Sequence, residues 1–452
     1  MSASLVGSEM CIRDSLIIIG SGPGGYNTAC HAAKNGLNTI IFEDRQAGGT
    51  CLNRGCIPTK TLCHEADMIE AVATMTGSRP EVDFNKAMTR KEQVTAQLRE
   101  GVEGLMKSPG ITFIKERASF KDSKTIIAGG EEYTADNIII ATGSESKLPP
   151  IEGIDEEGVV TSTELLNLEK LPKHLCIIGA GVIGMEFASV FKTFGSDVTV
   201  IEFLKECLPA IDSDIAKRMR KVMERRGINF NMQSAVKSIH KNNNKLTVCF
   251  DKKNKPQKVE ADIVLVATGR KPNIEGLGLE NTDINYDNKG IKVDDNMQTN
   301  ICGIYAIGDV NGRAMLAHAA TAQGMRAVNH ICGKKDAIRM EIMPAAVFTN
   351  PEVAGVGLTS DQCDSMGIEY NTRKGFYRSN GKALAMDESE GMVKLITDKD
   401  NKIIGCHAYG AHAADLIQEA TAIMNFNGTT ENLVDIIHTH PTLEEILHDA
   451  AL

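Results

Sequence analysis

The feature that most constrains the fold is a glycine pattern that the chain contains twice. In the first copy, a short apolar run leads into a G-x-G-x-x-G series formed by Gly20, Gly22 and Gly25, and a helix-like stretch follows. A second apolar run then ends on an acidic residue, Glu43. A strand, a tight glycine turn, a helix and a second strand in this order predict a β-α-β unit.

The second copy repeats every part of the first. Its glycines are Gly179, Gly181 and Gly184, and its second strand ends on Glu202. The first glycine and the acid are 23 positions apart in both copies, since they stand at 20 and 43 and at 179 and 202. A spacing of about 20 residues is typical of dinucleotide-binding units. One such series is a weak signal, whereas two complete units in register are a strong one.

Each glycine of such a series has a physical reason. The first allows a tight turn, the second lets the backbone approach a pyrophosphate, and the third lets the helix and the strand pack closely. The N-terminus of the helix then faces the phosphates, and the acid accepts hydrogen bonds from a ribose. The sequence therefore predicts two dinucleotide sites.

Three later strands support the same arrangement. Runs at 138–143 and 264–269 both end in Ala-Thr-Gly, as buried parallel strands do before a crevice. A third run ends in Asp309, where a polyol hydroxyl can bind. Beyond about residue 340 the pattern changes to strands, turns and helical stretches, which predict a separate α/β domain with antiparallel strands.

The predicted fold class is therefore α/β, with two doubly wound, Rossmann-like domains, the second inserted into the first, and a further C-terminal domain. We assign residues 14–146 and 271–338 to the first domain, residues 147–270 to the second and residues 339–452 to the third. Residues 1–13 fit no strand or helix that the first glycine series needs, and LVGSEMCIRD resembles translated sequencing adapter. We expect this short stretch to be non-native.

Two cysteines stand out after the first unit, in the run GGTCLNRGCIPTK. Cys51 and Cys56 are five positions apart at an expected helix start, where they can form a disulfide across one irregular turn. A helix N-terminus favours the reactive thiolate, and Lys60 follows one turn after Cys56. Zinc is the alternative for such a pair, but the sequence offers no second Cys/His pair beside it. Within a dinucleotide-binding domain we predict a redox pair and no metal site.

Composition narrows the function classes. The net charge of −10, from 49 basic and 59 acidic side chains, argues against a nucleic-acid binder. No apolar run approaches the ~20 residues that cross a membrane. Among the other cysteines, Cys30, Cys176, Cys249 and Cys302 stand in apolar surroundings, and we expect inert buried thiols there. Scattered cysteines and an N-terminus without a secretory pattern favour a reducing, cytoplasmic compartment.

Several motifs together resemble the pyridine nucleotide–disulfide oxidoreductase family. They are GGTCLNRGCIPTK, the two glycine series, ATGS, ATGRKPN, YAIGD and the His-Thr-His-Pro-Thr run at 438–442. The resemblance extends from about Asp14 to Leu452 in the family's order, and it is closest to the dihydrolipoamide dehydrogenase branch. It implies an enzyme that oxidises protein-bound dihydrolipoamide through Cys51, Cys56 and FAD, and passes hydride to NAD⁺.

The resemblance also implies the residues that hold the two cofactors. The implied FAD set is Gly20, Gly22, Gly25, Glu43, Lys60, Thr142, Gly143, Ser144, Asp309, Met315, Leu316, Ala317 and His318. The implied NAD set is Gly179, Gly181, Gly184, Glu202 and Gly269. Glu202 favours NAD over NADP, because a carboxylate suits a free ribose 2′-OH and repels a 2′-phosphate. Neither Phe203 nor Leu204 is an arginine that would hold such a phosphate.

The catalytic roles are implied in the same way. Cys51 exchanges with the substrate, and Cys56 is the sulfur next to the flavin. Thiol attack needs a base near neutral pH, and His440 matches the family's base, with Glu445 as the carboxylate that orients it. We treat His438 as a supporting residue.

One further pair and the partners follow from the resemblance. Glu186, on the expected helix of the second unit, matches an acid that relatives pair with the lysine at the position of Lys60, beside the flavin. Because relatives take the base from the other subunit, the resemblance implies a homodimer. It also implies lipoyl domains of 2-oxoacid dehydrogenase or glycine cleavage complexes as partners.

Other activities remain as alternatives. Glutathione reductase-like enzymes normally use NADP and lack the pair formed by His438 and His440. Mercuric reductases and large-type thioredoxin reductases carry further C-terminal cysteines, whereas the last cysteine here is Cys406. A catalytically idle flavoprotein subunit of a dehydrogenase complex would need neither the cysteine pair nor the base.

Overall fold

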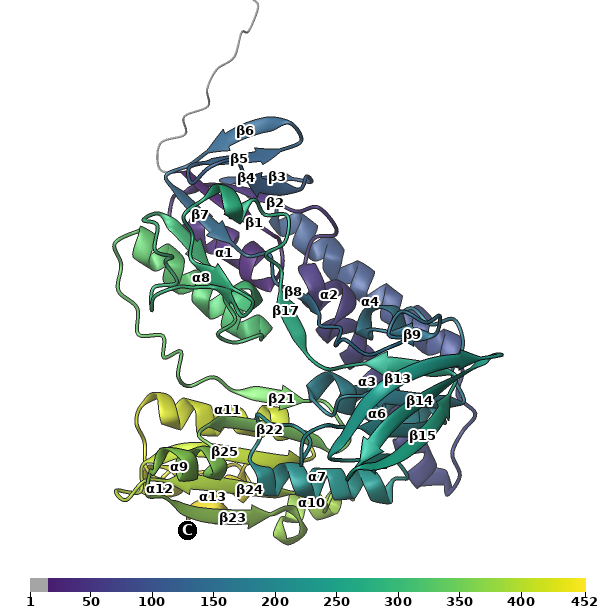
Figure 1. Cartoon of the computed structure of the whole chain (residues 1–452). Helices are drawn as coiled ribbons and strands as arrows, with labels where there is room; N and C mark the ends of the chain where they lie inside the picture. Colours follow the sequence, from purple (N-terminus) through teal and green to yellow (C-terminus); the bar gives the residue numbers. More distant parts are fainter. Residues whose placement is uncertain (1–14) are drawn as a thin grey trace, which may run out of the picture. The chain divides into compact units, whose positions relative to one another are not determined.

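The structure is a computed structural model that describes residues 15–452. The stretch expected to be non-native, residues 1–13, lies outside the described residues. Contacts divide the described chain into two compact units, whose elements are labelled in Figure 1. The first unit contains the chain up to Pro58, Glu92–Ser146 and Arg270–Ile338. The second contains Thr59–Lys91, Lys147–Gly269 and Arg339–Leu452.

The first unit is built on a parallel sheet with the strand order β20-β7-β1-β2-β3. Its strands are β1 (Ser15–Ile19), β2 (Asn38–Phe42), β3 (Ile111–Ile114), β7 (Asn137–Ile140) and β20 (Ile304–Ala306). Leu16, Ile17 and Ile18 of the central strand are all fully buried. Because both faces of this sheet are covered, its strands are continuous apolar runs without alternation.

Helices α1 (Pro23–Lys34) and α8 (Ala317–Ile331) lie side by side in this unit (Figure 1). Their backbones approach closely because α8 carries a glycine at the contact. A Cβ built at Gly324 would lie 1.7 Å from Oγ1 of Thr28 on α1. This contact holds the two helices against each other within the unit.

The remaining elements of the first unit are short. They are α2 (Gly49–Arg54), β4 (Ala118–Phe120), β5 (Thr125–Ala128), β6 (Glu131–Thr134), β8 (Ser144–Ser146), β17 (Arg270–Pro272), η1 (Leu279–Asn281), β18 (Tyr286–Asp287), β19 (Gly290–Ile291) and η2 (Gly308–Asn311). Strands β8 and β17 pair antiparallel, and they stand where the chain leaves the first unit and where it returns. Two long helices, α3 (Cys56–Thr76) and α4 (Phe84–Leu105), belong partly to each unit.

The second unit repeats the parallel sheet, now in the order β12-β11-β10-β16-β9. Its strands are β9 (Val159–Val160), β10 (His174–Ile178), β11 (Asp197–Ile201), β12 (Asn229–Asn231) and β16 (Ile263–Val266). Its helices are α5 (Ser162–Leu165), α6 (Val182–Phe194) and α7 (Ser213–Arg225), and an antiparallel sheet adds β13 (Ser234–Asn242), β14 (Lys245–Lys252) and β15 (Lys255–Ala261). The core order β16-β10-β11-β12 matches β7-β1-β2-β3 of the first unit, as the repeated glycine pattern predicts.

The C-terminal part of the second unit forms an antiparallel sheet with the order β21-β22-β25-β24-β23. Its strands are β21 (Ala345–Val347), β22 (Glu352–Gly357), β23 (Asn371–Phe376), β24 (Met392–Thr397) and β25 (Ile403–Gly410). Its helices are α9 (Ser360–Met366), η3 (Tyr377–Ser379), α10 (Gly381–Ala385), α11 (Ala413–Asn425), α12 (Thr430–Val434) and α13 (Glu445–Ala451). Helix α11 packs on β22 and β25, and α13 packs on β23 and β24.

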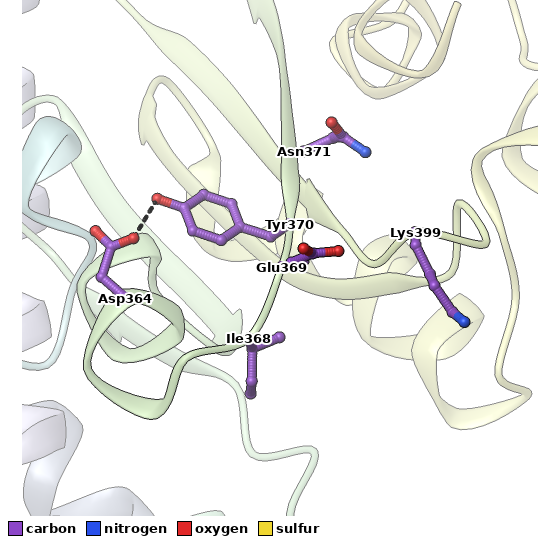
Figure 2. A pocket seen from close by; sticks show the side chains of 6 residues that line it. All are labelled: Asp364, Ile368, Glu369, Tyr370, Asn371 and Lys399. Carbon is purple, nitrogen blue, oxygen red and sulfur yellow. Dashed lines mark hydrogen bonds between the residues drawn. The ribbon is translucent and has the colours of Figure 1, made fainter.

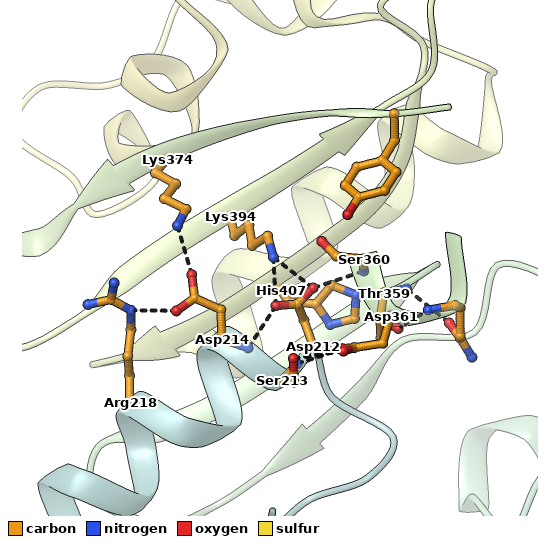
Figure 3. Close-up of polar contacts among 12 residues, drawn as sticks. Asp212, Ser213, Asp214, Arg218, Thr359, Ser360, Asp361, Lys374, Lys394 and His407 are labelled. Atoms are coloured by element: carbon orange, nitrogen blue, oxygen red, sulfur yellow. Dashed lines mark hydrogen bonds and ion pairs between the residues drawn. The ribbon is translucent and has the colours of Figure 1, made fainter. Parts of the chain in front are cut away.

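A buried ion pair joins α7 to the C-terminal sheet (Figure 3). Nζ of Lys394, on β24, lies 2.8 Å and 2.9 Å from the two carboxylate oxygens of Asp212. Asp212 also caps α7 by accepting from the N–H of Asp214 at 3.1 Å, and it accepts from the N–H of Ser360 at 2.9 Å. The side chains of Asp212 and Lys394 are only 0% and 7% exposed. The inserted sheet and the C-terminal sheet are thus tied together by charge as well as by apolar packing.

The predicted fold class is confirmed, since the structure contains the two parallel sheets of the doubly wound domains and a further antiparallel sheet near the C-terminus. The expectation of buried thiols is wrong for three of the four cysteines named from the sequence. Cys302 is exposed, because it lies in the turn before β20 and not within the strand. Cys30 and Cys249 are partly exposed, whereas Cys176 is fully buried and burial raises its pKa to about 12.

Candidate active site and nucleotide sites

The first glycine series forms the tight turn that the sequence predicts. Gly20 has a φ of +103°, and a Cβ there would lie 2.5 Å from the carbonyl oxygen of Ala141. A Cβ at Gly25 would lie 1.9 Å from the carbonyl oxygen of Gly20, so only glycine lets α1 pack this closely on the turn. Gly22 is the N-cap of α1.

The second series has the same geometry. Gly179 has a φ of +108°, and its Cβ would lie 2.5 Å from the carbonyl oxygen of Ala267. A Cβ at Gly184 would lie 2.0 Å from the carbonyl oxygen of Gly179. In contrast, a Cβ at Gly181 or Gly269 would meet no described atom within 4 Å. The backbone at these two positions faces open space, which leaves room for a ligand to approach.

The carboxylate of Glu43, at the end of the second strand of the first unit, accepts hydrogen bonds from residues near the glycine turn. Oε2 of Glu43 accepts from the N–H and the hydroxyl of Ser21, at 2.9 Å and 2.8 Å, and Oε1 accepts from the N–H of Arg45 at 3.0 Å. Each carboxylate oxygen has further lone-pair capacity for a ribose hydroxyl. The contacts place the carboxylate beside the glycine turn, as a nucleotide site requires.

The acid of the second unit is held in the same way. Oε2 of Glu202 accepts from the N–H of Ala180 at 2.5 Å, and Oε1 accepts from the N–H of Leu204 at 2.7 Å. The next side chain, Phe203, is 75% exposed and carries no charge. A ribose 2′-OH suits this carboxylate, whereas a 2′-phosphate would meet a negative charge.

The residues present fit two dinucleotides. Helices α1, α6 and α8 have the N-caps Gly22, Gly181 and Leu316, and the described structure shows no side-chain cap at any of the three. A helix start without a side-chain cap is a common place for anionic groups such as a pyrophosphate to bind. The other residues implied for FAD near α8 all lie around the start of that helix: Met315, Ala317 and His318.

Ser144, Asp309 and Arg270 form a polar cluster at the point where the chain leaves the first unit and returns to it. The hydroxyl of Ser144 donates to Oδ2 of Asp309 at 2.5 Å. Burial raises the pKa of Asp309, although Ser144 and Arg270 oppose that shift. The hydroxyl of Thr142 donates to a backbone oxygen at 2.7 Å, and Gly143 has a φ of +73° and faces open space. The FAD residues implied for this strand therefore lie at its carboxyl end, as expected for a nucleotide crevice.

The sequence reasoning missed Arg270 in this group. Nε of Arg270 donates to Oγ of Ser144 at 2.7 Å, and Nη2 donates to the carbonyl oxygen of Ser144 at 2.6 Å. Burial lowers the pKa of Arg270, and the charges of Asp309 and Cys56 oppose the shift. No motif or spacing in the sequence singles out Arg270, because its contacts with Ser144 span 126 positions.

The two cysteines lie on either side of a helix break. Cys56 is the first residue of α3, as expected, and Cys51 lies within the short helix α2, where an irregular turn was expected. Gly55, with φ −148° and ψ −105°, separates the two helices. Both cysteines are partly exposed. A thiol at the start of a long helix is stabilised as the thiolate by the helix N-terminus.

Lys60 and Glu186 form an ion pair in the second unit. Nζ of Lys60 lies 2.7 Å and 2.9 Å from the two oxygens of Glu186, whose side chain is 4% exposed. The N–H of Phe348 donates to Oε1 of the same carboxylate at 2.9 Å, and the Phe348 ring lies 4.7 Å from Nζ of Lys60. The ion pair thus joins helix α3 to helix α6, and the family resemblance predicts the same pairing of Lys60 with Glu186.

His440 and Glu445 are also brought together. Nδ1 of His440 lies 2.9 Å from Oε1 of Glu445, the first residue of α13. The N–H of Thr442 donates to Oε2 at 2.8 Å. This N–H and then His440 hold the pKa of Glu445 below its usual value. A carboxylate that is ionised accepts from Nδ1–H, and the His440 side chain, 80% exposed, presents Nε2 to solvent.

A hollow in the described part of the chain contains no predicted site residue. The hollow, of 450 Å³, is lined by Asp364, Ile368, Glu369, Tyr370, Asn371 and Lys399 (Figure 2). The Tyr370 hydroxyl there donates to Asp364 at 3.1 Å. Residues 15–452 contain no group of His, Cys, Asp and Glu side chains arranged to hold a metal ion. Within the same residues, every helix is too short or too polar to span a membrane.

Comparison with known proteins decides the family. The model of the family described as pyridine nucleotide-disulphide oxidoreductase matches residues 14–324, and the model of that family's dimerisation domain matches residues 343–451. The chain belongs to this family. The oxidoreductases of this family use FAD and NAD, and the chain is accordingly an NAD-dependent flavoprotein disulfide oxidoreductase. The match to the dimerisation domain supports a homodimer.

Relatives of this oxidoreductase carry different names. The mitochondrial dihydrolipoyl dehydrogenase of Pisum sativum is 38% identical over 97% of this chain and 91% of its own. A leghemoglobin reductase of Glycine max is also 38% identical, over 97% of this chain and 87% of its own. A solved structure, the Cu(II) complex of the HOCl-induced flavoprotein disulfide reductase RclA from Escherichia coli, superposes with a TM-score of 0.86 at 31% identity over 96% and 98% of the two chains. The family is thus common to all three, whereas the named activities differ.

Proposed function

We propose that this oxidoreductase is a dihydrolipoamide dehydrogenase, which oxidises dihydrolipoyl groups and reduces NAD⁺. The observation that carries the proposal is the exposed imidazole of His440, oriented by Glu445, in a chain that also has Cys56 at a helix start and Cys51 beside it. A base for thiols and a pair of sulfurs are the two groups that dithiol oxidation needs. The name of the pea relative supports the same activity.

Cys51 is the sulfur that exchanges with the substrate. A substrate thiolate attacks Sγ of Cys51 and breaks the Cys51–Cys56 bond, so Cys56 leaves as a thiolate and a mixed disulfide forms. The second substrate thiolate then attacks the substrate sulfur of that mixed disulfide, closes the lipoyl ring and releases Cys51 as a thiolate. The substrate loses two electrons, which the enzyme disulfide gains, and two protons, of which His440 holds one and the released Cys51 thiolate takes the other. When bound, FAD supplies the two-electron chemistry that connects the enzyme dithiol to NAD⁺.

His440 takes up a proton from the substrate thiols. Because Nδ1–H donates to Glu445, Nε2 keeps its lone pair and acts as the acceptor. The ionised carboxylate of Glu445 fixes the orientation of the ring and stabilises the imidazolium that forms. The exposed His440 side chain is available to act in the other subunit of the homodimer, as the resemblance implies.

The remaining assignments are proposals of the same kind. We propose residues 14–146 and 271–338 as the FAD-binding domain, residues 147–270 as the NAD-binding domain and residues 339–452 as the dimerisation domain. The FAD and NAD sets named from the sequence serve as the cofactor residues, with Lys60 and Glu186 as a charge pair beside the flavin. The partners are lipoyl domains of 2-oxoacid dehydrogenase or glycine cleavage complexes. A reducing, cytoplasmic compartment remains a prediction from the cysteine pattern.

Steady-state assays with several substrates test the proposal. We expect rapid reduction of NAD⁺ by dihydrolipoamide and much slower reduction of NADP⁺, because Glu202 repels a 2′-phosphate. A protein that binds FAD but does not oxidise dihydrolipoamide contradicts the proposal. In that case, NADH oxidation with a panel of disulfides and with ferric leghemoglobin would identify which of the alternative activities replaces it.

A further inference from the structure

A second histidine–carboxylate pair lies two residues before the proposed base, and the mechanism above does not use it. Nε2 of His438 lies 2.8 Å from Oε1 of Glu419, on α11, and Nδ1 lies 2.9 Å from the carbonyl oxygen of Ile436. The His438 side chain is 8% exposed, compared with 80% for His440. The His-x-His run thus places one imidazole inside the protein and the other in solvent.

The hydrogen bonds of His438 determine the charge of the pair. The carbonyl oxygen of Ile436 only accepts, so Nδ1 carries a hydrogen. A second hydrogen lies between Nε2 of His438 and Oε1 of Glu419. If His438 carries this hydrogen, an imidazolium faces a carboxylate. If Glu419 carries it, both side chains are neutral. The pair has no net charge in either arrangement.

The carboxyl of Glu419 depends on His438 as its hydrogen-bond partner and as the group that balances its charge. Its second oxygen, Oε2, is buried and has no hydrogen-bond partner in the described part of the chain. An ionised carboxyl buried without a partner is strongly unfavourable. Removing the imidazole would therefore leave either an uncompensated negative charge or a carboxyl forced to take up a proton.

The pair is close to the groups that surround the proposed base. The ring of His448, on α13, packs edge-on against His438 with centroids 5.4 Å apart. The buried thiol of Cys406, on β25, lies near Glu419, which contributes to its raised pKa after burial itself. On α13, the N–H of Thr442 and then His440 lower the pKa of Glu445, and His438 adds a smaller contribution. His438 is therefore close enough to act on the carboxylate that orients His440.

We propose that His438 and Glu419 position the base. Their contact pins the segment that carries His440 to helix α11, and it compensates the partly buried carboxylate of Glu419, whose side chain is 21% exposed. His438 is a positioning residue, since it acts through His440. This role for His438 and Glu419 rests on the proposed function, because its test measures the oxidation of dihydrolipoamide.

The pH profile of kcat/KM for dihydrolipoamide tests the inference in His438→Gln, Glu419→Gln and the double variant. His438→Gln keeps a donor near Glu419 but removes the compensating charge. We expect kcat/KM to fall about tenfold from the loosened segment. An uncompensated carboxylate favours the protonated base, so the acid limb of the profile should move up by about one pH unit. The double variant removes that carboxylate, so its limb should return to the wild-type position while the rate stays low.

A matched control exists on the same helix. His412 lies 3.6 Å from Asp415 and is 58% exposed, so this pair is also a histidine with a carboxylate but is open to solvent. His412→Asn preserves the left-handed backbone at φ +55°, which asparagine tolerates. We expect this variant to match the wild type in rate and in pH profile. Flavin absorbance and circular dichroism confirm that each variant is folded, and Glu419→Gln keeps the test possible if His438→Gln does not fold.

The outcomes separate the inference from the function on which it rests. A wild type that does not oxidise dihydrolipoamide contradicts the proposed function. A wild type that turns over, with a His438→Gln variant of equal rate and equal profile, contradicts the inference alone. A shifted limb that persists in the double variant contradicts the charge balance, because the proposed source of the shift is then absent.

Discussion

Nζ of Lys60 lies 2.7 Å and 2.9 Å from the two oxygens of Glu186, so one ammonium contacts both oxygens of a carboxylate that is 4% exposed. The two residues stand 126 positions apart, on α3 and α6. A charge-assisted contact of this kind is among the stronger polar contacts in a protein. It fixes the position of an ammonium four residues after Cys56, on the same helix.

Glu186→Gln should slow hydride transfer between the flavin and NAD while FAD stays bound. The substitution keeps the shape of the side chain but removes the charge that orients Lys60, and we expect a loss of about tenfold in that step. Stopped-flow reduction by NADH measures the step directly. Glu70→Gln is the control, because Glu70 also joins α3 to α6, through Oγ1 of Thr193 at 3.1 Å. Reduction rates equal to those of the wild type would rule out the proposed role of Glu186.

Glu202→Ala should weaken the preference for NAD. The carboxylate is the group that accepts from a ribose 2′-OH and repels a 2′-phosphate, and loss of a charge-assisted hydrogen bond costs about tenfold or more. We expect kcat/KM for NAD⁺ to fall and the ratio of NAD⁺ to NADP⁺ activity to narrow. Glu43→Gln, the equivalent change in the first unit, should lower FAD content and leave that ratio unchanged. A ratio unaffected by Glu202→Ala would contradict the assignment of the second glycine unit.

Lys394→Met should destabilise the protein far more than Lys374→Met. The first change leaves the fully buried carboxylate of Asp212 without its partner, and breaking a buried pair costs about 3–5 kcal/mol. Lys374 lies 2.7 Å from Asp214 in the same cluster, but the two side chains are 34% and 32% exposed (Figure 3). Such an exposed pair contributes about 0–1 kcal/mol. Denaturant unfolding of the two variants provides the comparison, and equal losses of stability would contradict it.

The stability of the protein should fall as the pH drops below about 6.5, partly because of His407. This side chain is 1% exposed, and burial lowers its pKa although the carbonyl oxygen of Leu358, 3.1 Å from Nε2, opposes the shift. Above that pH the ring is neutral in both states and contributes nothing. Below it the unfolded chain binds a proton that the folded chain does not, so unfolding is favoured by up to about 1.4 kcal/mol per pH unit.

Urea midpoints measured from pH 8 to pH 5 test this dependence. His407→Leu removes the titrating group at similar size, so we expect a lower stability at all pH values but a flatter slope below pH 6.5. His412→Asn, at a histidine that is 58% exposed, should keep the wild-type slope. A slope in His407→Leu as steep as in the wild type would assign the effect to other groups.

The features that follow from local backbone rules could be predicted from the sequence. Gly20 and Gly25 were expected at a tight turn and at a close helix contact, and the clashes that a Cβ would make there explain both positions. The apolar runs of β1 and β10 were expected as buried parallel strands because they lack alternation. The candidate site was predicted mainly from the family resemblance and less from physical rules, because a lone histidine such as His440 does not by itself indicate a catalytic role.

The features that depend on tertiary packing could not be predicted. Arg270 contacts Ser144 across 126 positions, and Lys394 contacts Asp212 across 182 positions. Neither pair shares a spacing or a motif, because the contacts arise only when separate elements pack together. Cys302 shows the opposite error, since apolar neighbours in the sequence suggested burial while the turn before β20 exposes the thiol.

The most direct test of the account compares Cys51→Ser with Cys302→Ser in the reduction of NAD⁺ by dihydrolipoamide. The central claim is that Cys51 is the sulfur that receives the substrate, whereas Cys302 is an exposed thiol outside the candidate site. We predict that Cys51→Ser keeps its FAD and loses turnover by at least about a thousandfold, because no mixed disulfide can form. Cys302→Ser should match the wild type. Turnover that survives in Cys51→Ser would contradict the account.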